Sequence, residues 1–253
     1  MKNTDTITAI STPQGEGGIG IIRISGEEAI NIGNQILRHL SGKKITTWPE
    51  RQVRLGLAVF PDGSVIDEVI YFLFKNNRSY TGEDVLEIQG HGGIQNLKKI
   101  LNSTLKAGAR LAEPGEFTKR AYLNGRIDLA QAEAVIDLIR SRTDLAHKAA
   151  LTQLRGDLST VIKEQEKKLM EILVPLEAAL DFPEDEIPDL QREEALKIVE
   201  GAIYKINELL ENADQGMILR DSATVVLAGR PNVGKSSLLN SLDRKSTRLN
   251  SSH

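Results

Sequence analysis

The most specific chemical pattern in this sequence lies near its end, where LAGRPNVGKSS occupies residues 227–237. Gly229, Gly234, Lys235 and Ser236 fit the pattern G-x-x-x-x-G-K-[ST]. Glycines let such a loop turn its backbone N–H groups toward phosphate oxygens, and the following helix adds the positive end of its dipole. The lysine reaches the β- and γ-phosphates, and the serine hydroxyl binds Mg²⁺. The pattern therefore predicts a nucleotide phosphate site.

A glycine turn beside an ordinary surface lysine is the competing interpretation of this loop. The context favours the phosphate site, because TVVLA at 224–228 is typical of a buried strand and residues 236–242 can begin a helix. A complete nucleotide domain of this kind needs about 150 residues. We therefore expect residues 215–242 to be the truncated start of an α/β P-loop domain that cannot hydrolyse nucleotide by itself.

The last eleven residues, DRKSTRLNSSH at 243–253, have almost no apolar character and do not continue the predicted helix. They are also encoded by a DNA sequence that resembles a common sequencing-library adapter read in frame. We expect this segment to be an artefact of that kind and leave it out of the interpretation of the fold.

The elements ahead of the loop divide into two kinds. Up to about residue 93 the chain looks strand-rich, and apolar runs at 52–60 and 65–74 flank the turn PDGS, which predicts a hairpin. A short strand at 85–89 and a helix at 94–107 follow. This mixture predicts an α+β domain.

From residue 114 to about 221 the apolar spacing is helical. Asp128 and Gln131 have the spacing of a capping box at the start of a helix. Its apolar stripe extends from Leu129 to Leu145, and further stripes occupy 158–176 and 196–210. Pro175 predicts a kink or a break in the second of these helices. Three successive amphipathic helices predict part of an α-helical bundle domain.

Composition sets limits on the compartment and the partners. The 253 residues carry a formal charge of −3 and no cysteine, which excludes disulfides, thiolate metal sites and a cysteine nucleophile. The N-terminus has no signal-peptide pattern, and no run approaches the roughly 18 apolar residues of a membrane span. We expect a cytoplasmic protein without a membrane segment.

Three further features have competing interpretations. The acidic segment DFPEDEIPD at 181–189 is better explained as a solvated loop than as a hard-metal site, because it lacks calcium-loop spacing. GEGGIG at 15–20 precedes a strand instead of following one, so a tight loop beside a ligand is favoured over a dinucleotide site. His91 is either structural or a proton carrier near a ligand.

Several long blocks of the sequence point to one family. They are DTITAISTPQGEGGIGIIRISG, SYTGEDVLEIQGHGG, EPGEFTKRAYLNGRIDLAQAEAVIDLI, AALDFPEDEI and AGRPNVGKSSLLN. In this order, and over essentially all of residues 1–242, the sequence resembles the MnmE (TrmE) family of tRNA-modification GTPases.

The resemblance implies a domain plan and an activity. Residues 1–121 would form an α+β domain that binds tetrahydrofolate and dimerises, residues 122–214 the first part of a helical domain, and residues 215–242 the start of the GTPase domain. With the flavoprotein MnmG in a heterotetramer, the family uses GTP hydrolysis and a one-carbon unit from 5-formyl- or methylene-tetrahydrofolate. The product is a carboxymethylaminomethyl-type group at C5 of the wobble uridine of tRNA.

The resemblance also implies site residues. Arg23, Glu87 and Arg126 match folate-contacting positions, and their types suit a pterin, since a guanidinium donates to carbonyls and a carboxylate accepts from ring N–H groups. On spacing alone, a strand-edge charge or a salt bridge remains the alternative for each. The GTP contacts implied are Asn232, Val233, Gly234, Lys235, Ser236 and Ser237, with K⁺ on Asn232 and Mg²⁺ on Ser236.

Two other functions stay open at this point. The chain as it stands could be a folate-binding dimerisation module without turnover, because its nucleotide domain is incomplete. A generic GTPase of the ribosome-assembly type, with an unrelated N-terminal domain, would also carry this phosphate loop.

Overall fold

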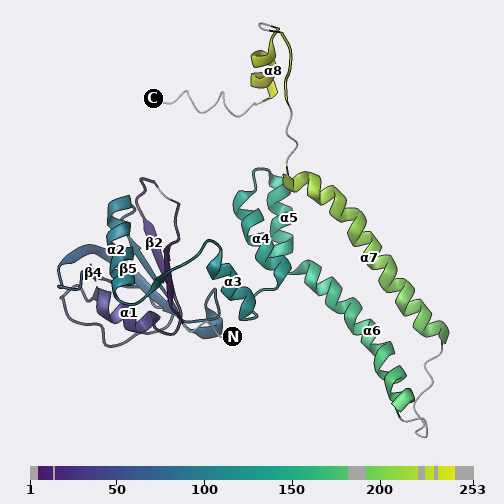
Figure 1. Cartoon of the computed structure of the whole chain (residues 1–253), viewed down its shortest axis with the longest axis horizontal. Helices are drawn as coiled ribbons and strands as arrows, with labels where there is room; N and C mark the ends of the chain where they lie inside the picture. The colour runs from purple at the N-terminus through teal and green to yellow at the C-terminus, as the bar shows by residue number, and fades with distance from the viewer. Residues whose placement is uncertain (1–4, 14, 182–191, 222–225, 231–232, 243–253) are drawn as a thin grey trace. The chain divides into compact units, whose positions relative to one another are not determined.

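The computed structural model describes residues 5–13, 15–181, 192–221, 226–230 and 233–242, in two compact units divided between residues 198 and 199. The first unit opens with a seven-stranded sheet of order β3-β4-β5-β6-β2-β1-β7 (Figure 1). All neighbouring strands are antiparallel except β1 and β7, which are parallel. The strands are β1 (Ile7–Ile10), β2 (Gly20–Ser25), β3 (Leu37–Arg38), β4 (Arg54–Val59), β5 (Val65–Phe74), β6 (Val85–Gly90) and β7 (Arg110–Leu111).

The core of this sheet domain lies on one face of the sheet. Ile22 and Ile24 of β2 are fully buried there with Ile32 of helix α1 (Ala29–Ile36) and Ile100 of helix α2 (Ile94–Lys106). Because side chains alternate along a strand, Arg23 lies on the opposite face. The mixed α+β architecture predicted from the sequence is confirmed.

The predicted hairpin between β4 and β5 is also confirmed. Its turn places Gly63 at φ 86°, and the Asp62 carboxylate accepts from the backbone N–H of Ser64 at 2.9 Å. Helix α1 was not predicted from the sequence, which looked strand-rich up to about residue 93. Gly33, a poor helix former, lies in this helix because a Cβ there would come within 2.6 Å of the Trp48 ring.

Helices follow the sheet. α3 (Glu116–Leu123) ends before Gly125, which has φ 68°, and α4 (Leu129–Arg140) begins with the predicted capping box. The Asp128 side chain accepts from the N–H of Gln131 at 2.9 Å, and the Gln131 side chain accepts from the N–H of Asp128 at 3.0 Å.

The apolar stripe from Leu129 to Leu145 does not belong to one helix, contrary to expectation. α4 ends at Arg140, and α5 (Asp144–Leu154) is a separate helix. Two hydroxyls account for the break, since Ser141 Oγ donates to the carbonyl of Leu138 at 2.8 Å and Thr143 Oγ1 caps α5 through the N–H of Ala146 at 3.1 Å.

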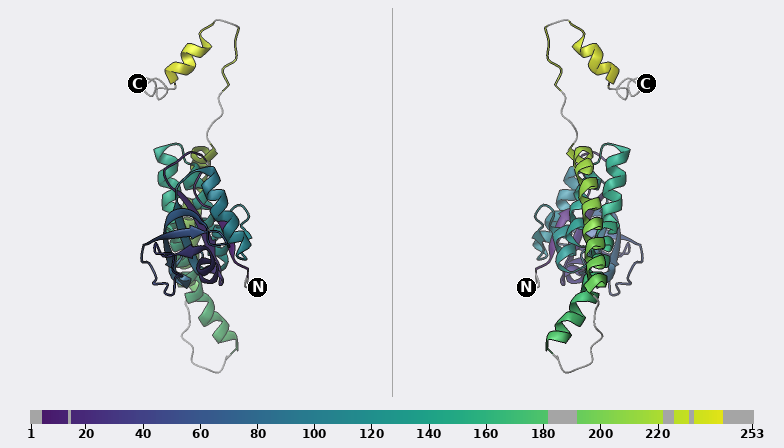
Figure 2. Two further views of the ribbon diagram at one scale, coloured as in Figure 1. Left: turned by 90° about the vertical axis from the view of Figure 1, so that its left-hand side faces the viewer. Right: turned by 90° about the vertical axis from the view of Figure 1, so that its right-hand side faces the viewer.

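Two long helices come next. α6 (Asp157–Asp181) continues through Pro175, so the predicted break is not observed; the proline removes one backbone donor within a helix of 25 residues. α7 (Arg192–Asp221) is unbroken (Figure 2). Residues 182–189 of the acidic segment lie outside the described part. Among the described residues no cluster of metal-ligand type is present, and no helix is long and apolar enough to cross a membrane.

The second unit contains the phosphate loop and α8 (Lys235–Leu242). Of the predicted strand at 224–228, residues 224 and 225 lie outside the described range, and residues 226–228 are not in a strand. A strand without neighbouring strands leaves its backbone N–H and C=O groups unpaired, which explains why residues 226–228 do not form one.

Candidate functional site

Arg23 and Glu87 lie directly opposite each other on the antiparallel strands β2 and β6. Arg23 Nε donates to Glu87 Oε1 at 2.8 Å, and a terminal guanidinium nitrogen lies 2.7 Å from the same oxygen. Their side chains are 26% and 13% exposed, so the pair is accessible from one side. Arg23 and Glu87 therefore form a salt bridge, and Glu87 Oε2 has no hydrogen-bond partner among the described residues.

Two aromatic rings flank the Arg23 guanidinium. Its Cζ lies 5.5 Å from the centroid of the Tyr80 ring and 5.6 Å from that of Phe117 in α3. At these distances a cation is attracted to the ring faces. The Tyr80 hydroxyl and Thr118 Oγ1 are 2.9 Å apart, which fixes the tyrosine to α3. The arginine therefore sits in a half-buried site made of one carboxylate and two aromatic rings.

Arg126, the third predicted folate residue, contacts the loop that carries Tyr80. Its Nε donates to the carbonyl of Ser79 at 3.1 Å, and the side chain is otherwise exposed. No direct contact joins it to Arg23 or Glu87. The structure thus pairs two of the three predicted residues and places the third against the neighbouring loop.

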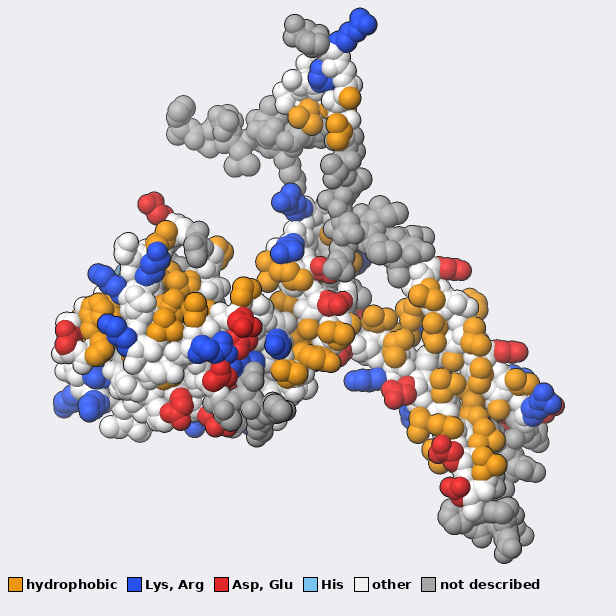
Figure 3. Space-filling view, in the orientation of Figure 1, with side chains coloured by type: hydrophobic (Ala, Val, Ile, Leu, Met, Phe, Trp, Pro, Cys, Tyr) orange, Lys and Arg blue, Asp and Glu red, His pale blue; other side chains and the backbone are white. Residues whose placement is uncertain are grey.

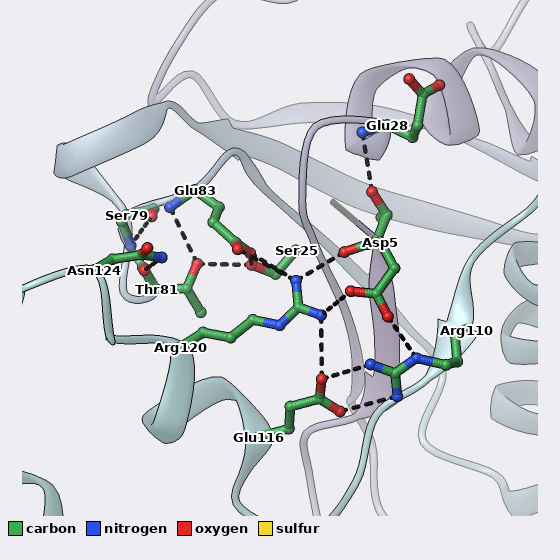
Figure 4. Close-up of polar contacts among 12 residues, drawn as sticks. Asp5, Ser25, Glu28, Ser79, Thr81, Glu83, Arg110, Glu116, Arg120 and Asn124 are labelled. Carbon is green, nitrogen blue, oxygen red and sulfur yellow. Dashed lines mark hydrogen bonds and ion pairs between the residues drawn. The ribbon is translucent and has the colours of Figure 1, made fainter. Parts of the chain in front are cut away.

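A buried ionic network lies beside this site, around Arg120 of α3 (Figure 4). Arg120 is 1% exposed and donates to Asp5 Oδ1 at 2.7 Å, to Glu116 Oε1 at 3.1 Å and to both Glu83 oxygens at 3.2 Å. Arg110 adds bonds to Glu116 at 2.6 Å and Asp5 at 2.7 Å. The network joins the residues before β1, the loop before β6, and α3.

The network shifts the ionisation of its members. Hydrogen bonds from Arg110 lower the pKa of Glu116 to about 2, against the opposing effect of burial. For Arg120, burial works to lower the pKa, but the charges and hydrogen bonds of Glu83, Glu116 and Asp5 outweigh it and raise the value. Both shifts favour the charged forms of Glu116 and Arg120.

Hydrogen bonds hold the loop from Ser79 to Glu83 in place on both sides of Tyr80. Glu83 Oε2 accepts from Ser25 Oγ at 2.7 Å, and Ser25 Oγ lies 2.7 Å from Thr81 Oγ1. Asn124 Nδ2 donates to the carbonyl of Thr81 at 2.7 Å. The backbone on both sides of Tyr80 is thereby fixed.

His91 and the GEGGIG segment occupy a different place, near the start of α2. His91 Nδ1 lies 2.7 Å from Asp67 Oδ1, and the Asp67 carboxylate also accepts from Asn96 Nδ2 at 2.6 Å. A Cβ on Gly92 would come within 2.4 Å of the Gly17 carbonyl, so these two glycine loops pack directly together. This close approach explains the glycine at position 92.

At the phosphate loop Gly234 has φ 86°, and the Lys235 ammonium donates to the carbonyls of Gly229 at 2.8 Å and Arg230 at 2.6 Å. Ser236 and Ser237 follow in the first turn of α8. A flexible cation at a helix N-terminus fits a phosphate group, and the Ser236 hydroxyl is of the type that binds Mg²⁺. Val233 belongs to the described residues, whereas Asn232, the predicted K⁺ ligand, lies outside them.

A separate hollow of about 510 Å³ lies between α5 and α6 and contains none of the predicted site residues. Its surface is mainly apolar, although three of its lining residues are polar or charged. Its lining residues are Leu145, Lys148, Ala149, Thr152, Gln153 and Leu158.

Sequence reasoning missed Tyr80, Phe117 and Arg120. All three fall within the blocks that carry the family resemblance, which was the one available signal. Nothing in their spacing shows that they converge, because Arg120 meets Asp5 across 115 positions of sequence.

Two protein-family descriptions together match nearly the whole of this chain. The family described as the GTP-binding protein TrmE N-terminus matches residues 6–126, and the MnmE helical domain matches residues 129–247. Three relatives, each named tRNA modification GTPase MnmE, come from Carboxydothermus hydrogenoformans, Clostridioides difficile and Symbiobacterium thermophilum.

The three relatives match this chain to nearly the same extent. The first is 50% identical over 242 residues, 95% of this chain and 52% of that protein. The other two are 49% identical over 94% and 95% of this chain, and 52% and 53% of their own lengths. The chain thus spans about half the length of these relatives. With its sheet domain matching one family description and its helices the other, the chain belongs to the MnmE (TrmE) family.

Proposed function

We propose that the protein is a tRNA-modification GTPase. The observation that carries this proposal is its 49–50% identity, over 94–95% of the chain, to three proteins of that name. In this proposal the protein acts with the flavoprotein MnmG in the cytoplasm, on the C5 position of the wobble uridine of tRNA. The group added is of the carboxymethylaminomethyl type.

The sheet domain would hold the one-carbon donor, a 5-formyl- or methylene-tetrahydrofolate. Glu87 Oε2 has no partner among the described residues and suits the N–H edge of a pterin, while the Arg23 guanidinium suits a carbonyl. Arg126, on the neighbouring loop, adds positive charge for the rest of the ligand. The rings of Tyr80 and Phe117 would keep water from one side of Arg23.

A homodimer through the sheet domain belongs to the same proposal. The face of the sheet opposite α1 and α2 exposes Leu55 of β4 and Ile70 of β5, which are 47% and 38% exposed and lie opposite each other in register. Apolar side chains gathered on a sheet face favour burial against a partner.

GTP, Mg²⁺ and K⁺ belong to the phosphate loop in this proposal. The Lys235 ammonium would exchange its two backbone carbonyls for phosphate oxygens, and α8 would direct its positive end at them. Ser236 would hold Mg²⁺, which neutralises charge as the terminal phosphate leaves. Asn232 would hold K⁺, with Val233, Gly234 and Ser237 as further contacts.

Nucleoside analysis of tRNA tests the proposal. In a strain in which the intact gene is disrupted, digested tRNA should lose the C5-modified wobble uridine, and the intact gene should restore it. The intact gene carrying Lys235→Ala should fail to restore it, whereas Lys98→Ala, on an exposed lysine of α2, should succeed. Unchanged wobble uridine in the disrupted strain would end the proposal.

A second candidate is a folate-binding dimerisation module without turnover. The absence of a strand at residues 226–228 favours it for this chain, because a phosphate loop needs a sheet to fix its geometry. Measuring phosphate release from GTP with this chain distinguishes the two. Release above background would exclude the second candidate.

A further inference from the structure

The loop that carries Tyr80 is fixed by α3 and the residues after it. Arg120 binds Glu83, Asn124 binds the carbonyl of Thr81, and Arg126 binds the carbonyl of Ser79. Tyr80 stands between these three attachments with its ring beside Arg23. The position of the ring is thus set by polar contacts of its neighbours, in addition to the bond between its own hydroxyl and Thr118.

Among these contacts, the one made by Arg120 has the largest desolvation cost, because its charge is buried. The Arg120 guanidinium and the Glu116 carboxylate are almost completely removed from water here, and Arg120 Nε is buried without a hydrogen-bond partner among the described residues. Apolar residues of similar volume often serve stability as well as a buried ion pair does. Charge-assisted hydrogen bonds fix the orientation of the groups they join. Contacts between apolar side chains do not fix orientation in this way.

We propose that Arg120 is a positioning residue for the candidate folate site. Through Glu83 it fixes Thr81 and Ser25, and through that loop it holds the Tyr80 ring against the Arg23 guanidinium. Arg23 therefore stays paired with Glu87 before a ligand binds, so ligand binding does not have to order these two side chains. The ligand part of this inference rests on the proposed function, whereas the control of Tyr80 by Arg120 does not.

Arg110 offers a matched control within the same network. It binds Asp5 and Glu116 as Arg120 does, but makes no contact with Glu83 or the loop from Ser79 to Glu83. If the position of Tyr80 depended only on the total charge of the network, Arg110→Met and Arg120→Met should therefore change it equally. Control of Tyr80 should be lost only in Arg120→Met.

The test is ¹⁹F NMR of protein labelled with fluorotyrosine, without ligand. The chain has four tyrosines, and the Tyr80 signal is assigned by its loss in Tyr80→Phe. The Tyr80 signal should shift toward that of an exposed, mobile tyrosine in Arg120→Met and stay in place in Arg110→Met. An unmoved signal in a folded Arg120→Met, or equal shifts in both variants, would overturn the inference.

Should Arg120→Met fail to fold, Glu83→Gln makes the same test. The amide keeps the shape and one acceptor for Ser25 Oγ but removes the charge that Arg120 holds. The Tyr80 signal should then shift in the same direction, and an unmoved signal would again contradict control through Glu83.

Binding of 5-formyl-tetrahydrofolate supplies the second readout. Arg120→Met should raise the Kd about tenfold, and this effect should fall below about twofold in a Tyr80→Ala background, because the ring it positions is gone. Equal effects in both backgrounds would show that Arg120 acts by another route. Wild-type protein that binds no reduced folate would end the proposed folate site, while the ¹⁹F comparison would still decide the control of Tyr80.

Discussion

The sheet domain and the helices α4 to α6 both contain many apolar residues but bury them to very different extents. In the sheet domain Ile22, Ile24, Leu86 and Ile88 are fully buried under α1 and α2. In α4 and α5 the only fully buried side chains are those of Ala134 and Ala150. The large apolar side chains exposed on α4 to α6 include Leu129, Ile136, Ile139, Leu145, Leu151, Leu158, Ile162 and Leu169.

This difference explains where a site can form. Hydrophobic side chains gather visibly along the long helices (Figure 3), and many of them are exposed. In the sheet domain the core supports strands whose other face carries Arg23, Glu87 and the Arg120 network. A precise constellation of charges needs such a rigid base, because its geometry is only as fixed as the backbone beneath it.

Large-to-small substitutions should separate the two regions most strongly. Ile24→Ala removes a wholly buried side chain and should lower the free energy of unfolding by about 3 kcal/mol. Ile139→Ala, on a side chain that is 74% exposed, should change it by less than about 0.5 kcal/mol. Urea unfolding followed by the fluorescence of Trp48, the single tryptophan, reports on the sheet domain and measures the effect of Ile24→Ala. Circular dichroism of the helical signal measures the effect of Ile139→Ala. Equal losses from the two substitutions would contradict the contrast.

Acid should act on the sheet domain through Glu116. Its pKa is about 2 in the folded protein against a usual value of 4.5, so the stability it contributes is present above pH 4.5 and is lost as the pH falls toward 2. The difference corresponds to about 3 kcal/mol. Glu116→Gln should flatten the loss of unfolding free energy between pH 5 and pH 2. An unchanged acid profile in this variant would assign the pH dependence to other carboxylates.

The helices should respond instead to local capping. Asp128→Ala removes the side-chain acceptor at the start of α4 and should reduce helix stability by about 1 kcal/mol. Circular dichroism should show the helical signal melting earlier, while the Trp48 unfolding midpoint stays in place. Glu133→Ala, on an exposed face of the same helix, is the control and should leave both unchanged. A shift of the Trp48 midpoint in Asp128→Ala would mean that the two regions unfold as one.

The sequence predicted those features that short-range rules determine. The turn at Asp62 and Gly63 and the capping box at Asp128 depend on a few neighbouring residues, and both are confirmed. The break after Arg140 was missed because an apolar stripe continues across it. There the hydrogen bonds of Ser141 and Thr143 decide the structure.

The candidate site was predictable only in part, and from a different signal. Arg23 and Glu87 stood out through the family resemblance, and the structure pairs them across β2 and β6. Tyr80 and Arg120 did not, because their contacts depend on how the loop before β6 meets α3. Such convergence is a property of the tertiary fold and leaves no periodic trace in the sequence.

The central claim, that the Arg23–Glu87 pair holds a reduced folate, is tested most directly by calorimetry with 5-formyl-tetrahydrofolate. Arg23→Met removes charge-assisted hydrogen bonds and should weaken binding by about tenfold to hundredfold. Arg78→Met, an exposed arginine of the same domain, should leave binding within about twofold of wild type. Binding of equal strength in wild type and Arg23→Met would contradict the account.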